Sequence, residues 1–185
     1  MKTIEYPSSL IDVTQASDDP LVFEPVTSSQ IDSQLILTWI NDPISLKMSY
    51  YEKPKTLPNF HGNRLLETLL DPQEIQFFCL IGEEKAALIL VSPLDSSLGE
   101  HSQCCQISIF IRPSYRGKGF ASKILSCIEA TLKNKNYISS YAEIMEENTI
   151  SQKAFIKAGY HFLCKQHINK NHRQHLVLCY IKKLI

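Results

Sequence analysis

Residues 103–133 read QCCQISIFIRPSYRGKGFASKILSCIEATLK and predict a strand, a tight turn and a helix in succession. The first part carries the β-branched and aromatic residues typical of a buried strand: Ile107, Ile109, Phe110 and Ile111. Pro113 ends this strand, because proline has no N–H to donate to a β-ladder. After the turn, apolar residues recur at the spacing of one helical face: Phe120, Ala121, Ile124, Leu125, Ile128 and Leu132. The rest of the chain is organised around this strand–turn–helix unit.

The turn itself, Arg116–Ala121, has the features of a phosphate-binding loop. Gly117 and Gly119 remove side-chain bulk where a ligand has to approach the backbone. The first turn of the following helix leaves amide donors without internal partners, and the helix dipole adds partial positive charge there. Arg116 and Lys118 contribute two full positive charges. Together these features predict a site for a phosphate or a pyrophosphate.

Known phosphate-loop patterns narrow the choice of ligand. A Walker A loop needs G-x-x-x-x-G-K-[ST], which the chain does not contain. The dinucleotide pattern G-x-G-x-x-G is matched by Gly117 and Gly119, but this chain has Ser122 at the third glycine position and lacks the surrounding βαβ units. Nicotinamide dinucleotide binding is therefore an alternative that departs from its known pattern in two respects. The loop resembles the [RQ]-x-x-G-x-[GA] motif of the GNAT N-acetyltransferase superfamily, which Arg116, Gly119 and Ala121 match.

A second stretch, Asn148–Tyr160, is similar to another signature of that superfamily, N-x-x-S-x-x-x-[FY]-x-x-x-G-[FY]. It predicts a short helix that Asn148 or Thr149 caps and that Gly159 ends in a left-handed conformation. We expect its buried stripe to consist of Ile150, Ala154, Phe155 and Ala158. The two motifs occur in the superfamily's order, separated by one helix and one strand, and the resemblance extends over residues 21–185.

The order of predicted elements, β-α-α-β-β-β-α-β-α-β-β, indicates an α+β fold. We expect a single mixed, mostly antiparallel central sheet of about seven strands flanked by helices. Residues 1–20 are predicted to form an N-terminal arm, in which Leu10–Val13 can add an edge strand, and residues 21–185 one acetyltransferase-like domain. The predicted strands span residues 21–26, 76–81, 86–92, 103–111, 137–145, 162–166 and 175–181, and the predicted helices residues 29–40, 62–70, 120–133 and 149–158.

Composition excludes several classes of function. Nineteen basic and nineteen acidic residues give a formal net charge of zero, so no global charge favours nucleic acid or an anionic membrane. No segment is long and apolar enough to span a bilayer, and the N-terminus lacks the apolar core of a secretory signal. The six cysteines form no C-x-x-C pair, and the late histidines have no partners at zinc-ligand spacing. We therefore expect a cytoplasmic protein without a metal, as a monomer or homodimer.

The resemblance implies an acetyl-CoA-dependent N-acetyltransferase in which an amine attacks the thioester directly in a ternary complex. The pantetheine arm would pair with the strand near Phe110–Arg112, which requires that strand to separate from the one at Tyr141–Met145. An amide near Phe110 or Ile111 would stabilise the developing oxyanion. Asn148 would position the pantetheine or the loop beside it. The residues that the resemblance assigns to the cofactor are Phe110, Ile111, Arg112, Arg116, Gly117, Lys118, Gly119, Phe120, Ala121, Asn148 and Phe155.

For proton transfer, Glu143 is the predicted general base, because it lies five positions before Asn148, where one ribosomal-protein acetylating group has its glutamate. Glu100 is the alternative, and water serves as the base in many members. The usual tyrosine that protonates the leaving thiolate is replaced by Phe155, which has no proton to give. Ser151 matches the hydroxyl position of the ribosomal-protein branch and is the substitute candidate.

The acceptor is the least constrained part of the prediction. The sequence W-I-N-D-P at residues 39–43 resembles the branch that contains ribosomal-protein N-terminal acetyltransferases. The acceptor is therefore expected to be a protein N-terminus or a small-molecule amine, with Tyr50, Tyr51 and His61 as candidate contacts. A non-catalytic acyl-CoA-binding module is the alternative, and it is motivated by Phe155 in place of tyrosine.

Overall fold

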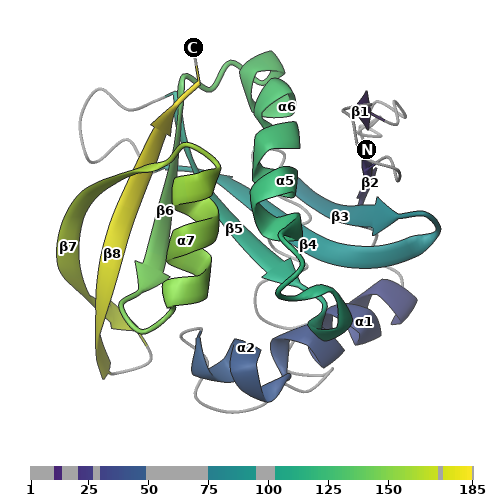
Figure 1. The fold of residues 1–185 in the computed structure, drawn as a ribbon, viewed down its shortest axis with the longest axis horizontal. Coiled ribbons are helices and arrows are strands. Elements are labelled where there is room, and N and C mark those ends of the chain that lie inside the picture. The colour runs from purple at the N-terminus through teal and green to yellow at the C-terminus, as the bar shows by residue number, and fades with distance from the viewer. Residues whose placement is uncertain are drawn as a thin grey trace, which may run out of the picture.

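A single mixed sheet forms the centre of the molecule (Figure 1). The computed structural model describes residues 11–13, 21–26, 30–48, 75–94, 103–170 and 173–184. Within these residues eight strands pair in the order β1-β2-β3-β4-β5-β6-β8-β7. The strands are β1 Ile11–Val13, β2 Leu21–Pro25, β3 Ile75–Ile81, β4 Glu84–Pro93, β5 Cys104–Ile111, β6 Ser139–Met145, β7 His161–Lys170 and β8 Arg173–Lys183. The predicted α+β class is confirmed, and β1 supplies the expected edge strand.

All strand pairings are antiparallel except the one between β5 and β6. A parallel pair needs a crossover connection, and the helices α5 (Phe120–Cys127) and α6 (Glu129–Asn134) provide it. The two were predicted as one helix, and the helical hydrogen bonding does continue through Ile128, whose N–H donates to the carbonyl of Ile124. The β5–α5 unit therefore begins the crossover that produces the only parallel strand pair in the described sheet.

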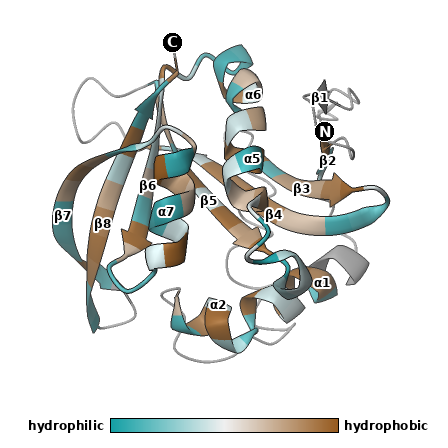
Figure 2. Cartoon of the chain, in the orientation of Figure 1, coloured by the Kyte–Doolittle hydropathy of each residue, from teal (hydrophilic) through white to brown (hydrophobic). Residues whose placement is uncertain are grey.

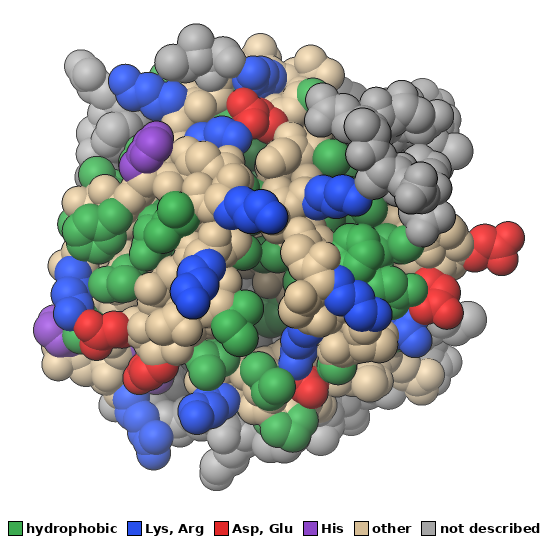
Figure 3. Space-filling model, viewed as in Figure 1, with side chains coloured by type: hydrophobic (Ala, Val, Ile, Leu, Met, Phe, Trp, Pro, Cys, Tyr) green, Lys and Arg blue, Asp and Glu red, His purple; other side chains and the backbone are tan. Residues whose placement is uncertain are grey.

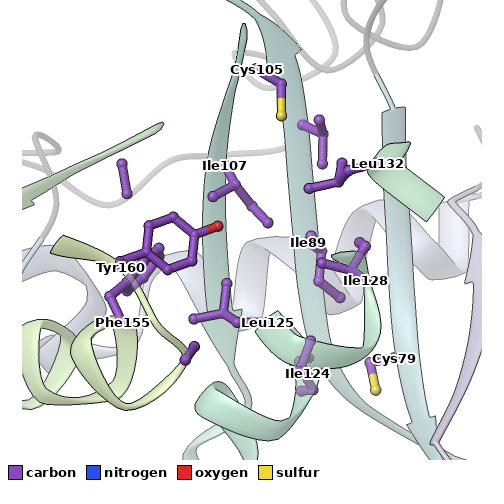
Figure 4. Close-up of a cluster of buried hydrophobic side chains, with 14 of the residues drawn as sticks. Cys79, Ile89, Cys105, Ile107, Ile124, Leu125, Ile128, Leu132, Phe155 and Tyr160 are labelled. Carbon is purple, nitrogen blue, oxygen red and sulfur yellow. The ribbon is translucent and has the colours of Figure 1, made fainter. Parts of the chain in front are cut away.

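Helices cover both faces of the sheet. On one face α5, α6 and α7 (Thr149–Lys157) pack against inward side chains of the central strands, as Figures 1 and 4 show. On the other face α1 (Gln30–Ile40) packs Trp39 edge-on against Phe78, with ring centroids 5.8 Å apart. The short helix α2 (Pro43–Lys47) follows α1 directly. Figure 2 shows that apolar residues concentrate along the central strands that separate these two layers.

Alternate side chains of each strand point to opposite faces of the sheet, so the sheet contributes to two hydrophobic cores. Ala87 and Ile89 belong to the cluster beneath α5, whereas Leu88 between them belongs to the cluster beneath α1. The same alternation places Ala142 and Ile144 of β6 under α5 and α7. Consequently the odd-numbered residues of β6 face the layer that contains α1.

The sequence placed most elements correctly but mispredicted parts of the second half. Asn148 caps α7, and Gly159 adopts φ +89° beyond its end, as expected. Ile150, however, is 77% exposed, so its assignment to the buried stripe was wrong. It occupies the first turn of α7, where the chain has only begun to turn onto the sheet. β7 and β8 are also longer than predicted, because their polar ends pair as a ladder.

Other predictions fall outside the described residues. These include the helix at residues 62–70 and most of the arm at residues 1–20, whose boundary stays a prediction. Among the helices that the structure describes, none has the length and apolarity to cross a membrane. Over the same residues, no group of three His, Cys, Asp or Glu side chains gathers in a way that could hold a metal ion.

Candidate active site

β5 and β6 pair only at their beginnings and then diverge. Their parallel register comprises Cys104 with Ser139, Cys105 with Ser140 and Gln106 with Tyr141. Beyond this point β5 continues to Ile111 along β4, and β6 continues to Met145 along β8. The predicted separation of the two strands is thus present, and it opens toward their carboxyl ends (Figure 1). Unpaired backbone groups must line such an opening.

The antiparallel ladder with β4 identifies which groups of β5 face the opening. Arg112 donates its N–H to the carbonyl of Ala86 at 2.9 Å. Because neighbouring residues of a strand direct their N–H and C=O groups to opposite sides, Ile109 and Ile111 direct theirs away from β4. Phe110 therefore uses its backbone in the β4 ladder, and its side chain packs against the cluster beneath α1. Of the predicted oxyanion donors, the geometry favours the Ile111 amide over that of Phe110.

The predicted phosphate loop forms a bare main-chain surface at the start of α5. A 3-10 turn, η2 (Pro113–Tyr115), leads into it, and Gly119 is the N-cap residue of α5. Gly117 and Gly119 adopt φ +74° and +80°, and a Cβ added at either would find no heavy atom within 4 Å. Lys118 between them is exposed, with its Nζ 5.4 Å from the ring centroid of Tyr115. The loop is open to a ligand, as an anion site at a helix N-terminus requires.

Basic side chains surround this part of the surface. Figure 3 shows Lys and Arg side chains around a hollow near the centre of the face that carries α5 and α7. The guanidinium of Arg112 forms an ion pair with Glu84, at 3.0 Å. Phe120 packs its ring edge-on against Tyr115 at 5.7 Å, and Ala121 follows it in the first turn of α5. The loop is therefore supported by aromatic contacts while its glycines stay uncovered.

Arg116 is directed toward α2 and away from the open loop. Its three nitrogens donate to Asp42 Oδ2 at 2.5 Å, to Ser45 Oγ at 2.8 Å and to the carbonyl of Ile111 at 3.0 Å. Burial alone would raise the pKa of Asp42, but hydrogen bonds from Arg116 and Ser45 and the guanidinium charge outweigh it and lower that pKa. No local sequence pattern indicates this partnership, because it joins residues 74 positions apart.

Glu143 lies on the α1 side of β6, next to the opening. One carboxylate oxygen, Oε1, accepts from Gln166 Nε2 at 3.1 Å and from the Tyr141 hydroxyl at 3.3 Å. Tyr141 also lies 3.0 Å from the sulfur of Cys179, and burial raises the pKa of this phenol. Within the described part of the chain, the other carboxylate oxygen has no hydrogen-bond partner. Glu143 is thus fixed through one oxygen, and the second is available to a substrate.

Residues of the second motif mostly serve α7 and the core. Asn148 Oδ1 accepts from the N–H of Ser151 at 3.1 Å, so this carbonyl is committed to capping. Phe155 is 3% exposed and packs edge-on against Tyr160 at 4.9 Å (Figure 4). The Tyr160 hydroxyl is in turn bound to Ser140 Oγ at 2.7 Å, and burial raises its pKa. The aromatic pair therefore leaves the Ser151 hydroxyl as the remaining candidate of this helix.

Two groups of predicted site residues cannot be placed relative to the opening. Tyr50, Tyr51 and His61, the expected acceptor contacts, and Glu100, the alternative base, lie outside the described residues. Tyr141, Gln166, Asp42 and Ser45 were missed by sequence reasoning. Of these only Tyr141 had a signal, because it shares a face with Glu143 two residues earlier in a predicted strand.

Comparisons with known proteins agree with this geometry. A spermidine N-acetyltransferase from Vibrio cholerae, in complex with CoA and spermine, superposes with a TM-score of 0.73 at 16% identity over 89% of this chain and 95% of its own. An N-acetyltransferase from Staphylococcus aureus Mu50 gives 0.71 at 21% identity over 89% and 99%. The aminoglycoside acetyltransferase AAC(6')-Ib in complex with coenzyme A and kanamycin gives 0.72 at 13% identity over 88% and 94%. No curated protein sequence matches the chain.

At these identities the superpositions establish a shared fold. The family-level result comes from the sequence itself, since residues 38–160 match the model of the acetyltransferase (GNAT) family. This match includes α2, the separated strands β5 and β6, the glycine loop and α7. The chain therefore belongs to the acetyltransferase (GNAT) family, which uses acetyl-CoA as a co-substrate.

Proposed function

We propose that this protein transfers the acetyl group of acetyl-CoA to an amine by direct attack within a ternary complex. The observation that carries the proposal is the opening between β5 and β6, which ends at the uncovered loop Gly117–Gly119. Strand β5 offers backbone hydrogen-bonding groups to an extended chain, and the adjacent glycine loop offers backbone amides to a diphosphate. Acetyl-CoA is a ligand with both parts.

The residues present fit that ligand. The amides of Gly117–Ala121 and the exposed charge of Lys118 would hold the pyrophosphate, since an added Cβ at either glycine meets open space. The N–H groups of Ile109 and Ile111, directed into the opening, are the available partners for the arm and for a carbonyl oxygen. Bound in this way, acetyl-CoA supplies an activated acetyl thioester.

The proton-transfer roles follow from the positions of two side chains. Glu143 presents its uncommitted oxygen on the α1 side of the opening and would accept a proton from the attacking amine. Ser151 is half-buried at the start of α7, and its hydroxyl is the group proposed to protonate the leaving thiolate. A thiolate is a stable leaving group in water, with an ordinary pKa of about 8.5, so a weak acid suffices here.

The acceptor is proposed to be an amine, either a protein N-terminus or a small molecule. Fold neighbours in complexes with kanamycin and spermine support the amine class. The W-I-N-D-P sequence is weaker support for the ribosomal-protein branch, because Trp39 lies in the core and Asp42 caps α2. A cytoplasmic location and a monomeric or homodimeric state complete the proposal; six unpaired thiols support a reducing compartment.

The test is incubation with acetyl-CoA and a panel of amines and N-terminal peptides, followed by thiol titration and mass spectrometry of the acceptors. Acceptor-dependent thiol release with acetylated product is the expected result. Tight CoA binding without thiol release on any acceptor would favour the acyl-CoA-binding module, to which the buried Phe155 also points. Absence of CoA binding would refute both functions.

A further inference from the structure

We infer that Arg116 is a positioning residue for the cofactor loop, held in place by Asp42 and Ser45, and not a ligand of the phosphate. This inference rests on the proposed function, because it concerns the loop that would bind coenzyme A. It departs from the sequence-based prediction, in which Arg116 and Lys118 both supply charge to a phosphate. Asp42 and Ser45, at the N-cap and in the first turn of α2, become part of the binding machinery.

Each nitrogen of the Arg116 guanidinium donates a hydrogen bond to another group of the protein. Each of its three nitrogens has a different acceptor: Nε binds the Ile111 carbonyl at 3.0 Å, while the terminal nitrogens bind Asp42 at 2.5 Å and Ser45 at 2.8 Å. A guanidinium is planar, so one orientation satisfies all three acceptors at once. Turning it toward a ligand would break charge-assisted bonds to groups that are themselves half-buried.

The carboxylate that accepts from Arg116 is also held by a second hydrogen bond. Asp42 Oδ2 also accepts the N–H of Ser45 at 3.0 Å, which caps α2 and fixes the carboxylate. The side chains of Arg116 and Asp42 are 25% and 17% exposed, so their charges offset each other in partly buried surroundings. Within the described residues Lys118 has no carboxylate partner. The net positive charge at the loop is therefore that of Lys118.

The hydrogen bond from Arg116 to the Ile111 carbonyl connects the Arg116–Asp42 ion pair to the proposed cofactor site. Ile111 is the last residue of β5, and its carbonyl lies on the side of the opening. Arg116, five positions later, spans the turn η2 and ties the end of the strand to the beginning of the glycine loop. With its other two bonds it ties both to α2. The direction in which the Gly117–Gly119 amides point is thus set by a side chain that faces away from them.

The two possible roles of Arg116 predict opposite effects of Asp42→Asn on coenzyme A binding. If Arg116 contacted phosphate, loss of the neighbouring negative charge would free the guanidinium and strengthen binding of the anion, or leave it unchanged. In the positioning role the same substitution loosens the loop, and Kd for coenzyme A by calorimetry should rise about tenfold, as expected for a lost charged hydrogen bond. Ser45→Ala, a milder change, should raise Kd in the same direction.

Further variants separate positioning from charge. Arg116→Lys keeps the charge but offers one donor centre, so it should bind coenzyme A as weakly as Arg116→Gln. In the Arg116→Gln background, Asp42→Asn should have no further effect, because the two residues act as a unit. Glu83→Gln removes the same charge from an exposed turn and should leave Kd unchanged. Unaltered or tighter binding by Asp42→Asn, or rescue by Arg116→Lys, would overturn the inference.

A measurement without ligand keeps this test independent of the proposed function. Hydrogen–deuterium exchange of the ligand-free protein should show faster exchange at residues 117–121 in Asp42→Asn and Arg116→Gln than in the wild type. Unchanged exchange there would refute the positioning role even if coenzyme A binds. Failure of the wild type to bind coenzyme A would instead refute the proposed function, and the exchange result would still decide the role of Arg116.

Discussion

Gly119→Leu should abolish coenzyme A binding at a small cost in stability. Gly119 adopts φ +80°, and a Cβ added there has no heavy atom within 4 Å, so the loop leaves open space for the start of a side chain. The left-handed conformation costs an L-residue roughly 1–2 kcal/mol, which sets the expected loss in free energy of unfolding. A phosphate oxygen has to lie about 2.9 Å from the amides on either side of Gly119. Leucine atoms occupying that space should raise Kd at least about a hundredfold, or ~2.7 kcal/mol.

Gly82 provides the matched control. It adopts φ +59° in the β3–β4 turn, and an added Cβ there also has nothing within 4 Å. Gly82→Leu should therefore lose a similar amount of stability in urea denaturation but keep wild-type affinity for coenzyme A in calorimetry. Equal affinity of Gly119→Leu and the wild type would show that the loop does not hold the diphosphate, and the active-site assignment would have to be abandoned.

Three further predictions concern the base, the core and the response to pH. Glu143→Gln should lower kcat about 10²- to 10⁴-fold without changing the affinity for coenzyme A, since a positioned base contributes that much; an unchanged kcat would indicate that water removes the proton. Tyr160→Phe removes the 2.7 Å hydrogen bond between the Tyr160 and Ser140 hydroxyls in the buried core and should lower the free energy of unfolding by about 1–3 kcal/mol in urea denaturation. Little further loss is expected when Ser140→Ala is added. The ion pair with Arg116 holds the pKa of Asp42 below its ordinary value of 3.8. The pair therefore stabilises the fold above pH 3.8, and this stabilisation is lost as the pH falls through the lowered pKa. Acid unfolding of Asp42→Asn should lack the loss of stability in that pH range, and identical acid transitions of the variant and the wild type would contradict the prediction.

Local physical rules account for the parts of the fold that the sequence predicted. The strand, loop and helix of residues 103–133 each have a signal within a few residues, and the same is true of the Asn148 cap and the Gly159 terminator. The exposure of Ile150 was missed because a helical period says which residues share a face but not where the first turn meets the sheet. β7 and β8 were predicted too short, since their polar ends resemble a loop until they pair.

Side-chain partnerships across the fold are a different matter. Tyr141 could be associated with Glu143, because alternate residues of a strand share a face. Gln166 reaches the same carboxylate from β7, which is separated from β6 in the sheet by β8. Nothing local marks that glutamine, whose position depends on the register of two hairpin strands. The structure thus supplied the group that orients the predicted base, although the sequence supplied the base.

Arg116 shows that a motif match does not by itself assign the role of a side chain. Its position in the loop pattern is a fact of the sequence, but a basic residue next to glycines looks the same whether it faces a phosphate or a carboxylate. In the structure its charged partner is Asp42, which belongs to W-I-N-D-P, the segment whose sequence resembles a substrate branch. In the structure Trp39 anchors α1 on Phe78, and Asp42 then presents its carboxylate to Arg116 from the start of α2. The positioning role inferred for Arg116 would explain both sequence features by one structural requirement, a fixed distance between α2 and the cofactor loop, and neither feature by itself identifies the acceptor.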